Sequence, residues 1–284
     1  LKPFWVEPVS LCCELVRIFS PLFAMGGCTS SSQAAGGAPK GGKGKVFGLN
    51  MSMNAAGPFL LASSTGRLDV ETVPMEKWKG AEFLAVNPFG QIPALQDGDV
   101  RMAESNAILR YIALKYAPEM YPKAPKVRGL IDWAMERFSS SVYKDVVACV
   151  YPAMGFAAPP SDVEAVGKKC TESLEAYCKV FLKSKYVTGD SLSIADFKLA
   201  PFFVACAHPG LQQVAKFTCP ERIMQFNKDF ADACKSSSII HSSEGTSVKE
   251  VLDAKTSPGE VKAASGFTGA AQAVSSSEKT GKCE

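Results

Sequence analysis

Histidine and cysteine are the residue types in this chain that most readily bind metals or carry out redox chemistry. The sequence has two histidines, His208 and His241, which leave little material for a histidine-built metal site. Its ten cysteines include no C-x-x-C pair, so neither a zinc ribbon nor a dithiol oxidoreductase motif is indicated. Single cysteines scattered along a chain suit a reducing compartment better than a disulfide framework. We therefore expect a cytoplasmic protein that binds no metal.

A glycine-rich segment at residues 37–44, GAPKGGKG, resembles a phosphate-binding loop. In such a loop a serine or threonine follows the lysine and ligates magnesium. Here Gly44 follows Lys43, and no strand is expected before the segment. The sequence therefore predicts a linker at this point rather than a phosphate loop.

A lipidation pattern is present if translation starts at Met25, with residues 1–24 as a translated leader. Residues 25–30 then read MGGCTS, which matches the N-myristoylation pattern with Gly26 as the acceptor. One myristoyl chain binds membranes only marginally, so palmitoylation of Cys28 or a basic cluster would supply a second signal. That cluster consists of Lys40, Lys43 and Lys45. The pattern predicts peripheral membrane attachment; the alternative is a flexible leader that matches by chance.

The length of 284 residues favours two domains. Hydrophobic residues make up 46% of the chain and charged residues 21%, which are ordinary values for a protein that buries a core. The net charge of +3 is not gathered into a basic stripe, which argues against a nucleic-acid-binding protein. No uncharged apolar run reaches about 18 residues, so no membrane-spanning helix is expected.

The elements expected between residues 45 and 119 follow the order β-α-β-x-β-β-α. Apolar runs and alternation predict strands over 46–49, 68–73, 92–95 and 100–103. Helical segments are expected over 58–63, 75–86 (a short helix or irregular turn) and 104–116. Pro58 is tolerated only in the first turn of its helix. The Asp97-Gly98 pair predicts a hairpin turn.

From Lys126 onward the pattern is helical throughout. Apolar residues recur every three to four positions from Leu130 to Val146 and again over 161–182. The stretch from Ser193 to residue 207 is nearly all apolar and is expected to be a buried central helix. Ser193 and Asp196 at its start can form a capping box.

The two ends of the chain are expected to be disordered. Residues 1–44 form the leader and linker described above. Residues 236–284 are rich in Ser, Ala, Gly, Thr and Lys and have almost no large apolar side chain. Such a segment cannot bury enough surface to offset the entropy lost on ordering.

Four segments together resemble the soluble glutathione S-transferases: residues 87–95 (NPFGQIPAL), 104–108 (ESNAI), 186–190 (YVTGD) and 191–197 (SLSIADF). Each motif alone is weak, but their order and separations match that family across about residues 45–235. The resemblance implies an α/β thioredoxin-like domain over 45–119 packed on an all-α domain over 120–235. It also implies a homodimer, buried partly along the helix near Lys126, and glutathione as co-substrate where the domains meet.

The resemblance assigns as glutathione-binding residues Lys79, Gln91, Ile92, Pro93, Glu104 and Ser105. Pro93 corresponds to the family's cis proline, beside which the Ile92 backbone can pair with the cysteinyl backbone of glutathione. Ser105 begins a helix, where free N–H groups and the helix dipole favour the γ-glutamyl carboxylate. Glu104 is expected near the ammonium group, and Lys79 at the glycyl carboxylate, with a solvated surface position as the alternative for Lys79. Helix capping is the alternative role for Glu104 and Ser105.

The resemblance also implies the residue that stabilises the glutathione thiolate. In serine-type members this residue follows the first strand, where Ser52 lies, and a helix-terminal hydroxyl can lower the pKa of a thiol. Serine-type members commonly continue with a proline and an arginine, whereas Met53 and Asn54 follow here. Asn54 is therefore a second candidate donor, and an ordinary loop serine is the alternative role for Ser52. No tyrosine or cysteine is nearby, so a theta- or delta-like serine-type member is expected.

The implied activity is conjugation of glutathione to small, hydrophobic electrophiles in detoxification, with peroxide reduction and isomerisation left open. Candidates for the apolar second-substrate pocket are Trp133, Arg137, Phe138 and Tyr143. Core packing is the favoured explanation for the three aromatic residues, and a surface ion pair explains Arg137 equally well. The chain is also similar to the transferase-like domain of the elongation factor 1 gamma subunit at residues 104–108 and 151–155 (YPAMG). That similarity implies the alternative of a non-catalytic binding module.

Overall fold

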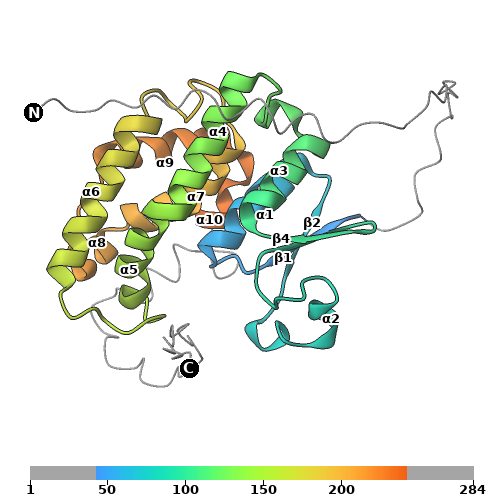
Figure 1. Cartoon of the computed structure of the whole chain (residues 1–284), viewed down its shortest axis with the longest axis horizontal. Helices are drawn as coiled ribbons and strands as arrows, with labels where there is room; N and C mark the ends of the chain where they lie inside the picture. Colours follow the sequence, from blue (N-terminus) through green and yellow to red (C-terminus); the bar gives the residue numbers. More distant parts are fainter. Residues whose placement is uncertain (1–42, 242–284) are drawn as a thin grey trace, which may run out of the picture. The chain divides into compact units, whose positions relative to one another are not determined.

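A four-stranded sheet forms the first half of the folded chain in a computed structural model, which describes residues 43–241 (Figure 1). Its strands are β1 (Lys45–Gly48), β2 (Asp69–Thr72), β3 (Ala94–Asp97) and β4 (Val100–Ala103). The order across the sheet is β2-β1-β3-β4. β1 and β2 are parallel because helix α1 (Met53–Thr65) returns the chain between them, whereas the other pairs are antiparallel. The predicted β-α-β-x-β-β-α order is confirmed.

The sheet separates two groups of buried side chains, because neighbouring residues of a strand point to opposite faces. Val46 and Leu95 belong to the core that α1 and α3 (Ser105–Tyr116) also enter. Phe47 packs on the other face with Phe83, which belongs to α2 (Ala81–Leu84). The turn η1 (Met75–Lys77) precedes α2. Figure 1 accordingly shows α1 and α3 on one side of the sheet and α2 on the other.

The turn between β3 and β4 has the form that the sequence predicts. Asp97 pairs with Val100, which leaves Gly98 and the next residue as the loop. Gly98 has a φ of 66°, a value that glycine adopts readily. β3 begins at Ala94 rather than at the predicted residue 92, directly after a cis Ile92–Pro93 bond.

The first helix begins earlier than we expected from the sequence. We expected Pro58 in its first turn, but α1 begins at Met53 and contains Pro58 in its interior. Ser52 caps the helix, since its Oγ accepts a hydrogen bond from the Ala55 N–H at 3.4 Å. The cap and the packing of α1 in the core override the local preference of proline.

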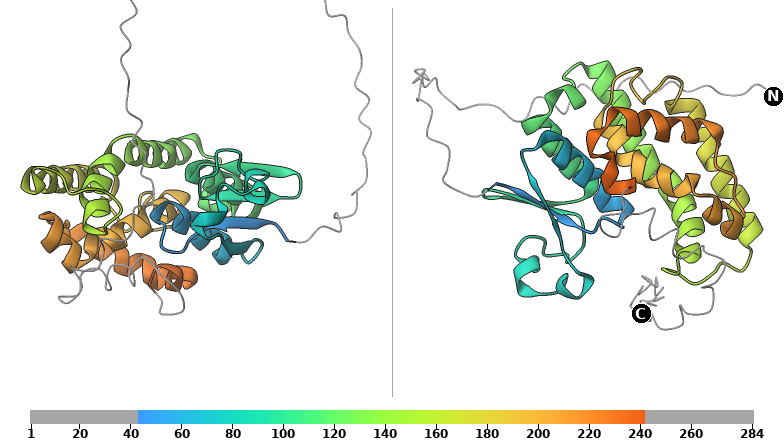
Figure 2. Two further views of the ribbon diagram at one scale, coloured as in Figure 1. Left: turned by 90° about the horizontal axis from the view of Figure 1, so that it is seen from below. Right: turned by 180° about the vertical axis from the view of Figure 1, so that it is seen from behind.

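Helices make up the second half of the described chain, and they gather on one side of the sheet-bearing half (Figure 2). In chain order they are α4 (Pro125–Arg137), α5 (Tyr143–Ala153), α6 (Val163–Phe181), α7 (Ile194–Ala207), α8 (Pro209–Ala215) and α9 (Glu221–Ala233). The short turn η2 (Pro118–Met120) leads into α4, and a π-helical segment, η3 (Phe138–Val142), joins α4 to α5. The all-helical pattern predicted for this part of the chain is confirmed.

α7 is the central helix of this half, as predicted. Its residues from Ile194 to Cys206 are all buried, and it contacts α1, α3, α4 and α9. The predicted capping box is present. The Asp196 carboxylate accepts hydrogen bonds from the Ser193 N–H at 2.8 Å and from the Val187 N–H at 3.0 Å. Complete burial nevertheless raises the pKa of the Asp196 carboxyl to about 6.

The described chain stays helical beyond the predicted start of the tail at residue 236. η4 (Lys235–Ser237) is followed by α10 (Ser238–His241), in which Ile240 is fully buried. That boundary is therefore corrected, because these residues pack against α1. Gly26, Cys28, the rest of the predicted tail and the leader up to residue 42 lie outside the described residues. Within residues 43–241, no helix is long and apolar enough to cross a membrane.

Candidate active site

A cavity of about 910 Å³ lies where the sheet-bearing half meets the helices. Its walls come from the loop after β1, the segment before β3, the first turn of α3, and side chains of α4, α5 and α7. The predicted site residues that line it are Ser52, Gln91, Ile92, Pro93, Glu104 and Ser105. In the described part of the chain, no cluster of His, Cys, Asp and Glu is suited to hold a metal ion.

Ser52 places a hydroxyl at the N-terminal end of α1, on the wall of the cavity. Free N–H groups and the helix dipole favour a negative charge at this position. Asn54 lines the same cavity, but both ends of its amide are engaged. Its Nδ2 donates to the Tyr143 hydroxyl at 3.2 Å, and its Oδ1 accepts from Lys198 Nζ at 3.3 Å. The second hydrogen of Asn54 Nδ2 remains available, but the Ser52 hydroxyl, which only accepts a hydrogen bond among the described residues, also lies at the helix end that favours a negative charge, so Ser52 is the better placed donor.

The segment from Gln91 to Pro93 forms the part of the wall that leads into β3. The Ile92–Pro93 bond is cis, as predicted. The buried Asn87 holds the segment, since its Nδ2 donates to the Gln91 carbonyl oxygen at 2.6 Å. Ile92 is half-buried at the edge of the cavity, which leaves this backbone within reach of a ligand.

Glu104 and Ser105 form the start of α3 at the cavity. Glu104 has a φ of 67° and a ψ of 115°, a conformation that residues other than glycine rarely adopt. Such strained backbone is concentrated at functional sites. The N–H of Ser105 is one of the free amides of the helix end, and its Oγ accepts a hydrogen bond from Lys198 Nζ at 2.9 Å. These groups together are suited to hold an anion.

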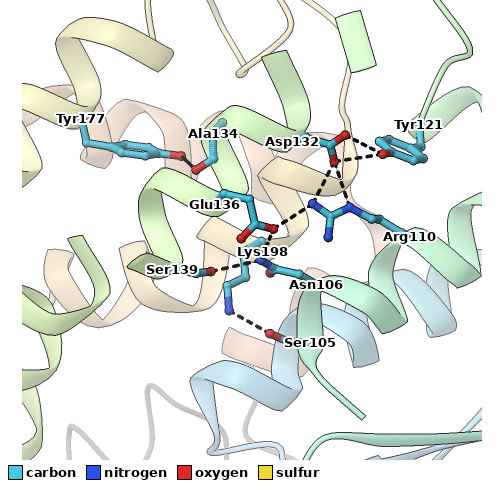
Figure 3. Close-up of polar contacts among 10 residues, drawn as sticks. All are labelled: Ser105, Asn106, Arg110, Tyr121, Asp132, Ala134, Glu136, Ser139, Tyr177 and Lys198. Carbon is cyan, nitrogen blue, oxygen red and sulfur yellow. Dashed lines mark hydrogen bonds and ion pairs between the residues drawn. The ribbon is translucent and has the colours of Figure 1, made fainter. Parts of the chain in front are cut away.

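Polar and charged side chains tie α3 to α4 and η3 beside this helix end (Figure 3). Arg110 donates to Asp132 and to Glu136, each at 2.9 Å. Asn106 donates to Ser139 at 3.1 Å. Because these contacts link the two halves of the structure, they hold the first turn of α3 in place against the helices.

Lys79 is the predicted glutathione-binding residue that does not line the cavity. It is exposed, and its Nζ donates to the Phe89 carbonyl oxygen at 3.1 Å. The neighbouring Trp78 lines the cavity instead. The expected contact between Lys79 and the glycyl carboxylate stays a prediction; in this structure the side chain is directed to Phe89.

Comparison with known proteins places the chain in a family. Residues 42–114 match the glutathione S-transferase N-terminal domain. Glutathione S-transferase F10 of Arabidopsis thaliana is 35% identical over 144 residues, which cover 46% of this chain and 67% of that protein. Glutathione S-transferase 3 of Zea mays is 35% identical over 164 residues, which cover 54% of this chain and 73% of that protein. The chain belongs to the glutathione S-transferase family.

Solved glutathione S-transferase structures share the fold of this chain. Glutathione transferase F2 from Populus trichocarpa has a TM-score of 0.57 at 23% identity, covering 75% of this chain and 98% of that one. Glutathione S-transferase-I bound with lactoylglutathione has a TM-score of 0.58 at 25% identity, covering 70% of this chain and 100% of that one. The predicted fold class, a thioredoxin-like α/β part with an all-α part, is confirmed.

The subgroup expected within the family needs correction. The similar transferases include plant F-type (phi-class) proteins, among them F10 of Arabidopsis thaliana and GSTF2 of Oryza sativa, which is 34% identical. The similarity thus lies with these proteins rather than with theta- or delta-like members. The resemblance to the elongation factor 1 gamma subunit stays a prediction.

The residues suggested by the sequence for an apolar second-substrate pocket line the cavity only in part. Of these, only Tyr143 lines the cavity. Trp133 is exposed and packs edge-on against Phe181, Phe138 is fully buried in the core, and Arg137 does not reach the cavity. Other apolar side chains that line the cavity include Met51, Tyr151, Met154 and Phe156. The last two lie beyond the end of α5, where no periodic pattern marks them.

Lys198 is a charged cavity residue that we did not predict from the sequence. It projects from α7, lines the cavity and is only 4% exposed. Burial lowers the pKa of its ammonium group to about 8, against the opposing effect of Glu104 and Glu136. The sequence feature that could have identified Lys198 is that it is a single lysine inside a helix that is otherwise nearly all apolar. Only the folded chain shows its partner, Ser105, which is 93 residues away.

Proposed function

We propose that this glutathione S-transferase conjugates the thiolate of glutathione to small electrophilic substrates, with Ser52 as the hydrogen-bond donor to the thiolate. The observation that carries the proposal is that Ser52, Ile92 and Ser105 line one cavity in a chain with transferase relatives. In the reaction the sulfur attacks an electrophilic carbon. A C–S bond forms, the leaving group departs with its bonding electrons, and the thiol proton has already passed to solvent.

In this proposal glutathione extends across the cavity from Ser105 to Ser52. The Ser105 N–H and hydroxyl hold the γ-glutamyl carboxylate, with Glu104 near the ammonium group. The Ile92 backbone pairs with the cysteinyl residue, and Gln91 contacts the peptide beside it. The sulfur then lies at the Ser52 hydroxyl and the free N–H groups of α1.

The effect of the Ser52 hydrogen bond on the pKa of the bound glutathione thiol follows from its expected energy. A hydrogen bond to a charged acceptor contributes about 1.5–3 kcal/mol. Lowering a pKa by one unit requires about 1.4 kcal/mol of preferential stabilisation of the charged form. Ser52 therefore accounts for a decrease of about one to two units in the pKa of the bound thiol.

The test is the substitution Ser52→Ala in the full chain, with the pKa of the bound thiol measured from the ultraviolet absorbance of the thiolate. We expect that pKa to rise by about one to two units, while the affinity for glutathione changes little. Ser63→Ala, at the far end of α1, is the matched control and is expected to change neither quantity. An unchanged thiol pKa in Ser52→Ala would exclude Ser52 and direct attention to Asn54. If the unmodified chain binds no glutathione at millimolar concentration, the non-catalytic module replaces the transferase.

A homodimer that uses α4 is a further part of the proposal. Its support is that two large apolar side chains, Leu114 on α3 and Trp133 on α4, are exposed. Sedimentation of the full chain tests it. We expect a dimer that Trp133→Glu converts to a monomer, and a chain that is already monomeric at micromolar concentration would contradict the proposal.

Location in the cytoplasm with peripheral membrane attachment rests on the sequence alone. Gly26 would be the myristoylated residue and Cys28 the palmitoylated one. Fractionation of cells that produce the chain with Gly26→Ala tests this. We expect the substitution to move the protein from the membrane fraction to the soluble fraction, and an unchanged distribution would argue against lipidation.

A further inference from the structure

Lys198 is a buried cation with neutral hydrogen-bond partners. Its Nζ donates to Ser105 Oγ at 2.9 Å and to Asn54 Oδ1 at 3.3 Å, and it lies 5.2 Å from the centroid of the Phe202 ring. Within residues 43–241, its Nζ forms no ion pair with a carboxylate. An ammonium group removed from water without an opposite charge is strongly unfavourable. The Lys198 ammonium group borders a large cavity, and an anion bound in that cavity would balance its positive charge.

The hydrogen bond from Lys198 also decides what the Ser105 hydroxyl can do. Because the ammonium group donates to Ser105 Oγ, the oxygen is engaged as an acceptor and its hydrogen is free to be donated elsewhere. A hydroxyl polarised by a cation in this way is a stronger donor. Ser105 also carries a free helix N–H, so hydroxyl and amide can both donate to one carboxylate. Figure 3 shows the lysine and the serine directed toward each other.

We propose that Lys198 is a positioning residue for glutathione: it orients the Ser105 hydroxyl toward the γ-glutamyl carboxylate and places a positive charge behind it. This inference rests on the proposed function and adds a residue from the helical half to that site. Because α7 supplies the charge, the carboxylate is held by both halves of the protein.

The charges around Lys198 determine how its role depends on pH. The groups that line the same cavity from neighbouring elements are Glu104 before α3, Arg110 on α3, Glu136 on α4, and Tyr143 and Tyr151 on α5. Arg110 is engaged with Glu136, and neither glutamate forms an ion pair with Lys198. With a pKa of about 8, Lys198 is charged in about half of the molecules at pH 8. A bound carboxylate favours the charged form and raises this pKa, so affinity is greatest at lower pH and decreases as the pH rises above about 8.

The experiment is a calorimetric titration of S-methylglutathione, which has no thiol to titrate, into the full chain and two variants. Lys198→Met removes the charge at similar side-chain length. Lys179→Met makes the same change in net charge on the exposed surface of α6. We expect Lys198→Met to weaken binding about ten- to hundredfold, the range for a hydrogen bond to a charged group, and Lys179→Met to leave it unchanged. We expect Lys198→Met to be no less stable to heat, because it removes a buried charge.

Proton uptake distinguishes a charge effect from a loss of packing. Titrations at pH 8 in two buffers of different ionisation enthalpy are expected to show that the unmodified chain takes up about half a proton more than Lys198→Met on binding. Equal affinities in the two proteins would overturn this inference alone and leave the proposed function standing. If Lys198→Met binds S-methylglutathione more weakly but takes up as many protons as the unmodified chain, the proposed role of the Lys198 charge is overturned. Failure of the unmodified chain to bind would overturn both the inference and the proposed function.

Discussion

α1 and α7 approach each other closely at Gly57, and the substitution Gly57→Ala tests how tightly they pack there. A Cβ on Gly57 would lie 2.6 Å from the Phe197 carbonyl oxygen, which is a backbone atom of a fully buried helix. Helix propensity alone would favour alanine by about 1 kcal/mol. Overpacking of a tight core costs about 1–3 kcal/mol, and an immobile backbone atom places this site in the upper part of that range. We therefore expect a net loss of about 1–2 kcal/mol in the free energy of unfolding.

Gly129→Ala is the matched control, because it is the same substitution in another helix without the close contact. Gly129 lies in α4, and a Cβ there would meet no atom of the described chain within 4 Å. We expect this variant to gain about 1 kcal/mol from helix propensity. Urea unfolding followed by circular dichroism measures both variants, with sedimentation to check that their association state is the same. A Gly57→Ala protein as stable as the unmodified chain would refute the argument from the α1–α7 contact.

Two further predictions concern the carboxylates of Asp196, which is buried, and Asp97, which is partly buried, and urea unfolding at a series of pH values measures both. Burial raises the pKa of Asp196 to about 6 in the folded chain, so its ionisation lowers stability as the pH rises from about 4 through 6. The stability difference between the unmodified chain and Asp196→Asn should therefore shrink between pH 4 and pH 7, and a constant difference would contradict this. Although partial burial raises the pKa of Asp97, hydrogen bonds from Lys115, Tyr116 and Tyr111 lower it overall. Asp97→Asn should lower the free energy of unfolding by about 1–3 kcal/mol at pH 7. This loss should become smaller below about pH 4, where the Asp97 carboxylate becomes protonated. An Asp97→Asn variant as stable as the unmodified chain at pH 7 would refute this prediction.

Much of the fold could be predicted because its signals are local. The Asp97-Gly98 turn, the capping box at Ser193 and Asp196 and the apolar run of α7 each depend on residues a few positions apart. Family motifs supplied the cis bond before Pro93, which composition and periodicity alone do not reveal. The predicted start of α1 was wrong because we applied a local rule about proline to Pro58. The Ser52 cap and packing in the core determine where this helix begins.

By itself, the sequence determined the order of the elements, the buried helix at the centre of the helical half, and the residue types available for binding an anion and a thiolate. Only the tertiary structure decided which of these residues meet. It brought Lys198 to Ser105 across 93 residues, directed Lys79 to Phe89, and placed Phe138 in the core. The physical reason is that periodicity and capping act within one helix or strand. The environment of a side chain in a cavity between two halves depends on packing between elements that are distant in the chain.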